Sequence, residues 1–408
     1  MFHSGQAMVW PLVTWAEASA SAIMALEILS QMYFASPVGD SPEARRYSRI
    51  NRFLSVADAV LGLELMLLLL LSSATNTLRD FSFQLGFHNY ALALFFYVLM
   101  LSLIGKLLSL ALDYYSFRLD HEYHLSTQRV GSWAWDQFKG FLVSLVISAL
   151  LAELLYLGIR EFPQTWWLVC WAFFLFLFVV FAQLAPVVLF PIFYHFKPLE
   201  NDALRERLTV LSTRAGTRVR GVYEWMLSEK SKKANAALTG LGNTRRIILA
   251  DTLLNNYSED EIEAVLAHEL GHHVHKHIFK SIVMQAVISF FGFWLLKLVV
   301  RYSYQSAGWF NSQYDFANLP LIVLVATALS LVLLPALNAY SRFNERQADR
   351  YAFGNIPSIE PFVTAMNKLS EQNLSERNPP RWVEILFHSH PAVSKRIAAA
   401  EAWNARRA

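Results

Sequence analysis

Cysteine is nearly absent from this sequence, which excludes two ways of building a stable site. The 408 residues contain one cysteine, Cys170, inside a long apolar run. A disulfide needs two cysteines, and cysteine-based metal sites need several, so neither fits within one chain. We therefore expect Cys170 to be a packing or lipid-facing residue.

Charged residues are also scarce. They make up 16% of the chain, while 55% of its residues are hydrophobic; soluble domains carry about a quarter charged residues. The first residues lack a basic region, so we expect no cleavable signal peptide and a first apolar segment that stays in the membrane. The net charge of +3 is small and says little about partners.

Long apolar runs are what the sequence has in abundance. A helix needs about 20 apolar residues to cross the hydrocarbon layer of a bilayer. Seven segments reach that length, so we predict an all-α polytopic membrane protein with seven transmembrane helices. The segments are 8–34, 54–74, 90–112, 139–159, 166–194, 278–300 and 319–340.

Basic residues are unevenly distributed among the loops between these segments. Arginines cluster between the first and second segments, and Lys and Arg are frequent after the fifth segment and near the C-terminus. Loops rich in Lys and Arg stay in the cytoplasm. This pattern predicts an N-terminus outside the cell, with residues 195–277 and the C-terminus on the cytoplasmic side.

Acidic residues lie deep inside some of the predicted spans. Asp58, Glu64 and Glu153 are examples. A charge that faces lipid is costly, so such residues generally face the interior of a helix bundle or a water-filled cavity. Together they favour a hydrated interior over a dry bundle.

The segment 196–277 is predicted to be a small α+β unit. Residues 201–214 favour a polar helix, and residues 235–240 and 245–250 favour two strands joined by the turn residues 241–244. The predicted organisation therefore has four parts. These are spans one to five in 1–195, the α+β unit in 196–277, spans six and seven in 278–340, and a third-ligand helix with a cytoplasmic tail in 341–408.

A second helix of this unit carries a metal-binding motif. Ser258 opens the helix, with Glu261 three residues later in the pattern of a capping box. Residues 268–272 read His-Glu-Leu-Gly-His, which places His268 and His272 on one helix face, so that both imidazoles can bind one zinc ion.

The glutamate between these histidines completes a catalytic pattern. Glu269 is placed to take a proton from a water on the metal as that water attacks a peptide carbonyl. Zinc lowers the pKa of such a water towards neutrality. The motif therefore predicts one catalytic Zn²⁺ per chain and a zinc metalloendopeptidase.

A catalytic zinc needs a third protein ligand. Residues 344–349, Asn-Glu-Arg-Gln-Ala-Asp, follow the last predicted span. They resemble the Asn-Glu-x-x-Ala-Asp element of gluzincins, zinc peptidases whose third ligand is a glutamate on a second helix. The resemblance makes Glu345 the third ligand. Asp349 lies one turn later and can orient a ligand imidazole, with His268 as the expected partner.

Three further histidines follow the motif. His275 lies a turn after His272 and can in principle approach the metal. We interpret His273, His275 and His277 instead as residues at the membrane interface.

Most of the chain resembles the type I CAAX prenyl protease family, integral-membrane gluzincins with a bundle of seven helices. The spaced prolines and phenylalanines of residues 186–199 resemble the family's exit from span five, and residues 115–120 resemble its loop after span three. That loop usually continues to Gly-Phe-Asn, where this chain has His-Leu-Ser at 124–126. The resemblance implies a hydrated chamber that the helices enclose, with the zinc site facing it.

The resemblance also implies substrate-binding residues. Asn235 and Ala236 match the family's Asn-Ala edge strand, and an extended substrate can add to the unpaired N–H and C=O groups of such a strand. Residues 387–391, Phe-His-Ser-His-Pro, match the family's Ser-His-Pro tail element together with Arg396 and Ile397. This match implies that His390 binds the substrate carbonyl and stabilises its oxyanion as a catalytic residue.

The family is named for cleaving prenylated CAAX tails, but two features favour a prokaryotic inner-membrane member. The chain has no obvious ER-retrieval tail, and the loop 301–318 is short. We expect a peptide or protein substrate, lipidated or not, together with membrane lipid and no nucleic acid.

Three other functions stay open. The first is a membrane-protein quality-control protease without prenyl specificity. The second is a site-2-type intramembrane protease, although that class places its motif inside a span and has an Asp-Gly ligand pair that this sequence lacks. The third is a non-enzymatic metal transporter or sensor.

Overall fold

The computed structural model describes residues 40–240 and 245–407. The first predicted span, 8–34, and the predicted turn, 241–244, lie outside these residues. The described part is mostly helical with one small sheet, so the predicted fold class is confirmed at this coarse level.

Six helical segments among the described residues are long and apolar enough to cross a membrane. They overlap the second to the seventh predicted spans, which confirms the multi-pass helical pattern. Most of them extend beyond the predicted apolar limits, because polar residues continue the helices past the apolar stretch. The segments are α2 (Pro42–Leu71), α4 (Tyr90–Glu122), α5 (Val130–Glu161), α6 to α7 (Trp166–Phe193), α11 (His277–Gln305) and η4 with α12 (Phe316–Asn355).

The fourth of these segments ends irregularly. α6 covers Trp166–Leu184, a π-helical turn η1 covers Ala185–Leu189, and α7 covers Phe190–Phe193. Pro186 and Pro191 lack the N–H group that an α-helix uses for its hydrogen bonds, so the regular helix does not continue here. The chain then enters the sheet.

The last span and the predicted third-ligand segment form one continuous helix. α12 itself runs from Leu319 to Asn355, without a break at residue 340. Glu345 therefore lies on a direct extension of a candidate span. Its position relative to the membrane is set by that helix rather than by a loop.

The sheet has four strands in the order β1-β2-β4-β3. The two predicted strands form as β3 and β4 and pair antiparallel, with β3 at the edge. β2 pairs parallel with β4 and antiparallel with β1, and neither β1 nor β2 is predicted, because both are short and mixed in composition. The bounds are β1 Phe196–Pro198, β2 Gly221–Trp225, β3 Ala236–Thr239 and β4 Arg246–Ala250.

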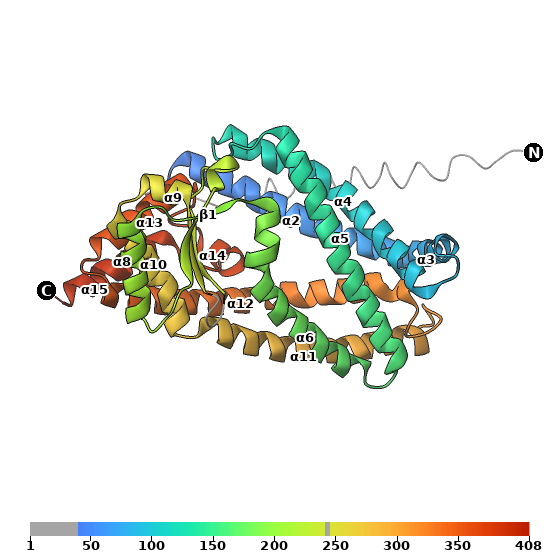
Figure 1. The fold of residues 1–408 in the computed structure, drawn as a ribbon. Coiled ribbons are helices and arrows are strands. Elements are labelled where there is room, and N and C mark those ends of the chain that lie inside the picture. The colour runs from blue at the N-terminus through green and yellow to red at the C-terminus, as the bar shows by residue number, and fades with distance from the viewer. Residues whose placement is uncertain (1–39, 241–244, 408) are drawn as a thin grey trace, which may run out of the picture.

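Shorter helices gather around the sheet, at one end of the long helices (Figure 1). The predicted polar helix forms as α8, which Asn201 caps by accepting from the N–H of Leu204 at 3.0 Å. The sequence does not predict α3, α13, α14 or α15. The bounds are α3 Ala74–Leu85, α8 Asp202–Arg214, α9 Asp251–Asn256, α10 Glu259–Val274, α13 Glu360–Gln372, α14 Arg381–Phe387 and α15 Val393–Ala405, with a 3₁₀ turn η2 at Leu227–Glu229.

The metal-motif helix is α10, and its predicted capping box is confirmed. The Ser258 hydroxyl accepts from the N–H of Glu261 at 3.3 Å, and the Glu261 carboxylate accepts from the N–H of Ser258 at 2.8 Å. Ile262, Leu266 and Leu270 are buried in a core shared with β4 and the end of α12. This burial holds α10 between the sheet and the last span.

A polar network ties the helices together at the end remote from the sheet, where α3 lies (Figure 1). Thr75 is 2.6 Å from the Tyr97 hydroxyl and donates to the carbonyl of Ala317 at 2.6 Å. Arg79 pairs with the buried Asp315 at 2.6 Å. Both ends of the long helices are therefore tied by contacts between residues far apart in the chain.

Candidate active site

The two motif histidines and Glu345 meet at one point. Nε2 of His268 lies 3.2 Å from Oε2 of Glu345, and Nε2 of His272 lies 3.2 Å from Oε1 of the same carboxylate. The two Nε2 atoms are 3.2 Å apart. α10 supplies both imidazoles and α12 supplies the carboxylate, so the packing of these two helices assembles the cluster.

These spacings fit a bound metal ion. Ligand atoms about 2.0–2.1 Å from a tetrahedral zinc lie about 3.3 Å from one another. Oε2 of Glu345 is buried and has no hydrogen-bond donor among the described residues, although buried carboxylate oxygens normally have one. Within residues 40–240 and 245–407, His268, His272 and Glu345 form the one group of three or more potential ligands that converges in this way.

A glycine allows the two helices to approach this closely. A Cβ atom on Gly271 would lie 2.8 Å from Cα and 2.9 Å from the carbonyl oxygen of Ala348, which is fully buried on α12. A side chain at this position would force the helices apart. The glycine of the metal motif therefore has a packing role that the motif alone does not reveal.

Asp349 holds the outer nitrogen of the first histidine. Nδ1 of His268 lies 2.8 Å from Oδ1 of Asp349, which is almost fully buried. Arg396 on α15 donates to both oxygens of the same carboxylate, at 2.6 and 3.0 Å. Histidines that bind metals usually donate their second N–H to such a partner, which leaves Nε2 free for the metal. Arg396 belongs to the tail element that resembles the family's, but the sequence does not predict its contact with Asp349.

The second histidine has a different outer partner. Nδ1 of His272 lies 3.1 Å from Nδ1 of His277, and Nε2 of His277 lies 2.9 Å from Oε1 of Gln347. His277 is buried at the start of α11, so the interpretation of this residue as a membrane-interface histidine misses its contact with the cluster. His273 and His275 do not join the three converging residues.

His390 approaches the cluster from the C-terminal part of the chain. Its Nε2 atom lies 3.3 Å from Oε1 of Glu345, and its Nδ1 atom lies 2.9 Å from the Ser389 hydroxyl. Arg342 on α12 fixes the preceding turn by donating to the carbonyls of Glu384 and His388, at 2.7 and 2.6 Å. The sequence places Arg342 directly after a predicted span but does not show that it is buried or that it contacts this turn.

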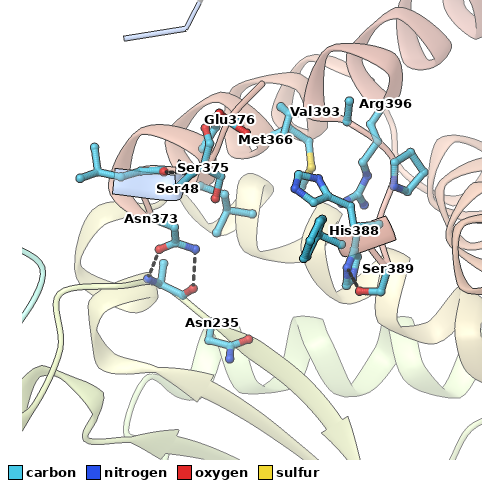
Figure 2. Close-up of a pocket in the computed structure, with 18 of the residues that line it drawn as sticks. Ser48, Asn235, Met366, Asn373, Ser375, Glu376, His388, Ser389, Val393 and Arg396 are labelled. Atoms are coloured by element: carbon cyan, nitrogen blue, oxygen red, sulfur yellow. Dashed lines mark hydrogen bonds between the residues drawn. The ribbon is translucent and has the colours of Figure 1, made fainter. Parts of the chain in front are cut away.

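The remaining predicted residues line one cavity of about 650 Å³. Glu269 lies on its wall, and desolvation raises the pKa of this carboxyl against the opposing effect of His268 and His272. Asn235 and Ala236, at the start of the edge strand, line the same cavity. Figure 2 shows Asn235 across the cavity from Ser389 and Arg396.

Comparisons with known proteins show the family of this chain. Residues 198–404 match peptidase family M48, and residues 40–195 match the N-terminal family of CAAX prenyl proteases, described as five membrane helices. A Bacillus subtilis protein named uncharacterized metalloprotease YhfN is 33% identical over 366 residues, which cover 88% of this chain and 84% of that protein. CAAX prenyl protease 1 of Saccharomyces cerevisiae is 30% identical over 321 residues, or 74% and 70% of the two chains.

The fold is also known from a solved structure. The crystal structure of Ste24p from S. mikatae superposes with a TM-score of 0.81 and covers 95% of this chain and 97% of its own, at 24% sequence identity. The family matches leave a metal transporter and a site-2-type protease without support. The chain belongs to peptidase family M48 and is a multi-pass membrane metalloprotease related to the CAAX prenyl proteases.

Proposed function

We propose that this chain is a zinc endopeptidase that cleaves membrane-associated proteins, including prenylated CAAX-type substrates. The observation that carries the proposal is that the His268, His272 and Glu345 cluster adjoins a cavity lined by both Glu269 and an edge strand. A cavity with these elements has ligands for the metal, a base for the nucleophile and a backbone surface for the substrate.

Each residue of the site has a proposed role. His268, His272 and Glu345 hold one Zn²⁺, which when bound supplies a Lewis acid that polarises the peptide carbonyl and lowers the pKa of water. The Glu269 carboxylate takes the proton of the attacking water and passes it to the nitrogen of the leaving amine. His390 donates a hydrogen bond to the carbonyl oxygen as negative charge develops there.

Two further roles concern orientation. Asp349 accepts the Nδ1–H of His268, which presents Nε2 of that ring to the metal. The Asn235 side chain and the Ala236 backbone bind the substrate backbone at the start of β3, where a peptide extends the sheet by one strand. An extended substrate on β3 enters the cavity that Glu269 also lines.

We propose a membrane arrangement that brings substrates to this site from the bilayer. The helices enclose a hydrated chamber within a prokaryotic inner membrane. The α+β unit of 196–277 and the C-terminal part, 341–408, are then cytoplasmic. The acidic residues Asp58 and Glu64 on α2 support the chamber, because such charges avoid lipid.

The choice between prenylated and other substrates rests on the relatives. The name of the Saccharomyces cerevisiae protein includes CAAX prenyl protease, which supports a prenylated substrate. Quality control of membrane proteins without prenyl recognition is the alternative. Cleavage of a peptide with and without a farnesyl group distinguishes them: equal rates would exclude prenyl recognition.

The test of the chemical mechanism is Glu269→Gln. The variant is expected to keep one zinc per chain, because Glu269 is not a ligand, and to lose at least about 10²-fold in cleavage rate. Glu345→Ala is expected to lose the metal. The matched control is Glu259→Gln, an exposed glutamate on the same helix, which should cleave normally. Unchanged cleavage by Glu269→Gln would overturn the mechanism.

A further inference from the structure

The edge strand β3 presents its backbone groups alternately to β4 and to the cavity side. Ala250 donates its N–H to the carbonyl of Asn235 at 3.0 Å, so Asn235 faces β4. In an antiparallel pair the next residue faces the other way. The outward positions are therefore Ala236 and Leu238, and, before the strand begins, Ala234.

Some of these outward N–H and C=O groups are free to bond a substrate, and others already have a partner. Among the residues that the structure describes, none outside the sheet bonds the outward groups of Ala236 or Leu238. Ala234 is different, because the side chain of Asn373 forms hydrogen bonds with both its backbone N–H and its backbone carbonyl. The Ala234 N–H donates to Oδ1 of Asn373 at 2.9 Å, and Nδ2 of Asn373 donates to the Ala234 carbonyl at 3.2 Å. Figure 2 shows this pair of bonds beside Asn235.

The Asn373 side chain thus imitates a substrate residue. Its carboxamide is the same chemical group as a peptide unit, and it exchanges two hydrogen bonds as one residue of an added strand does. One residue before Asn373, Gln372 donates to the carbonyl of Lys232 at 2.6 Å, two residues before Ala234 in the chain. The end of α13 therefore occupies the line that an extended peptide would follow past Ala234.

The same contact separates two cavities. Ala234, Asn235 and Asn373 line the active-site cavity, and they also line a second cavity of about 540 Å³ bordered by α4, α5 and the sheet. Ala234 is buried. The pair therefore forms a wall at one end of the substrate-binding edge rather than an isolated surface contact.

We propose that Asn373 ends the substrate-binding edge of β3 and so limits how far a substrate extends on one side of the cleaved bond. This inference rests on the proposed binding of substrate to β3. Within β3 two outward positions remain, Ala236 and Leu238, and they pair with substrate residues two apart in sequence. The enzyme then favours bonds close to one end of an extended segment.

The test uses two series of peptides around one cleaved bond, lengthened by single residues at the N-terminal or the C-terminal end. In the unmodified enzyme, kcat/KM is expected to fall beyond a fixed length in one series only. Asn373→Ala frees the Ala234 backbone, so it should raise kcat/KM for the longer peptides of that series about tenfold, through the two hydrogen bonds regained. Short peptides should be cleaved at the normal rate.

Controls separate the possible failures. Asn367→Ala, on the same helix, should keep the length limit, and Asn373→Asp should show an intermediate limit, because it accepts from the Ala234 N–H but cannot donate to the carbonyl. A length limit that is unchanged in Asn373→Ala, or absent from the unmodified enzyme, would overturn the inference. Failure of the unmodified enzyme to cleave even short peptides would instead overturn the proposed function.

Discussion

At the scale of single residues, the two metal-binding histidines are held by different partners. The outer nitrogen of His268 meets a carboxylate that also pairs with Arg396. The outer nitrogen of His272 meets the imidazole of His277. Both partners are buried, so neither is free to turn away from the ligand it supports.

Replacing the carboxylate tests the first contact. Asp349→Asn keeps the size of the side chain but removes its charge. His268 then loses an anionic hydrogen-bond acceptor, and Arg396 loses its ion-pair partner. Zinc affinity is expected to fall about 10–100-fold, as measured by competition with a chelator. An affinity equal to that of the unmodified enzyme would show that Asp349 does not support the ligand.

Replacing the histidine tests the second contact. His277→Phe keeps an aromatic side chain but removes the ring nitrogen that accepts from His272. Zinc affinity should therefore fall about tenfold. His275→Phe is the matched control, since His275 stacks on His277 at 5.6 Å between ring centroids but does not bond a ligand. Equal affinities for the two variants would assign His277 a packing role only.

At the scale of helices, the site depends on the distance between α10 and α12. The three protein ligand atoms of the site all come from these two helices. Gly271 lies directly against Ala348 where the helices touch. Lys368 on α13 pairs with Glu261 at the start of α10, at 2.7 Å. The position of α10 is therefore set at both of its ends.

Gly271→Ala tests the close contact. The added methyl group meets backbone atoms of Ala348, so α12 must move away and carry Glu345 with it. We expect loss of zinc binding and a lower melting temperature, from metal analysis and thermal unfolding. Gly105→Ala is the control, because a Cβ there meets nothing within 4 Å. Full zinc occupancy in Gly271→Ala would contradict the packing argument.

The cap of α10 predicts a pH dependence of stability. Burial opposes ionisation of Glu261, but hydrogen bonds from Lys368 and the Ser258 N–H outweigh it and hold the pKa of this carboxyl below its ordinary value. A carboxyl with a lowered pKa in the folded state stabilises the protein above its unfolded pKa, about 4.3, and this contribution is lost as pH falls.

Glu261→Gln should therefore lower the melting temperature at pH 7, and the difference from the unmodified protein should shrink as pH falls below about 4.3. Thermal unfolding across this pH range measures it. Glu206→Gln, an exposed position on α8, should show no such difference. A melting-temperature difference that is the same at every pH would exclude the ionised cap as its cause.

At the scale of the whole molecule, the active site lies at one end of the long helices. The sheet and the helices around it gather there, while α3 and the connection between α11 and α12 lie at the opposite end (Figure 1). In the proposed orientation the first end faces the cytoplasm. The orientation decides which side of the membrane receives the cleaved peptide.

Cysteine labelling tests this orientation. Cys170 is 2% exposed, so its background labelling should be low. Ser306→Cys, between α11 and α12, should react with a membrane-impermeant maleimide added to intact cells, whereas Glu401→Cys on α15 should react only after the membrane is opened. The reverse pattern would place the zinc site outside the cell.

The sequence by itself determined the features that repeat or lie close together along the chain. Apolar runs predict spans because each helix must be apolar over its own length. The two histidines of the motif are four residues apart, and the capping box spans three residues, so their geometry follows from one helix. The helices α13, α14 and α15 are not predicted, although α13 carries a local helical pattern, with Phe362, Ala365 and Met366 buried on one face.

Only the tertiary structure decided which distant residues support the site. Asp349 and Arg396 are 47 residues apart, His277 and Gln347 are 70 apart, and Ala234 and Asn373 are 139 apart. No periodic pattern links residues at such separations. Their contacts arise because the core brings α10, α12, α13 and the edge strand together, and packing of that kind depends on the whole chain at once.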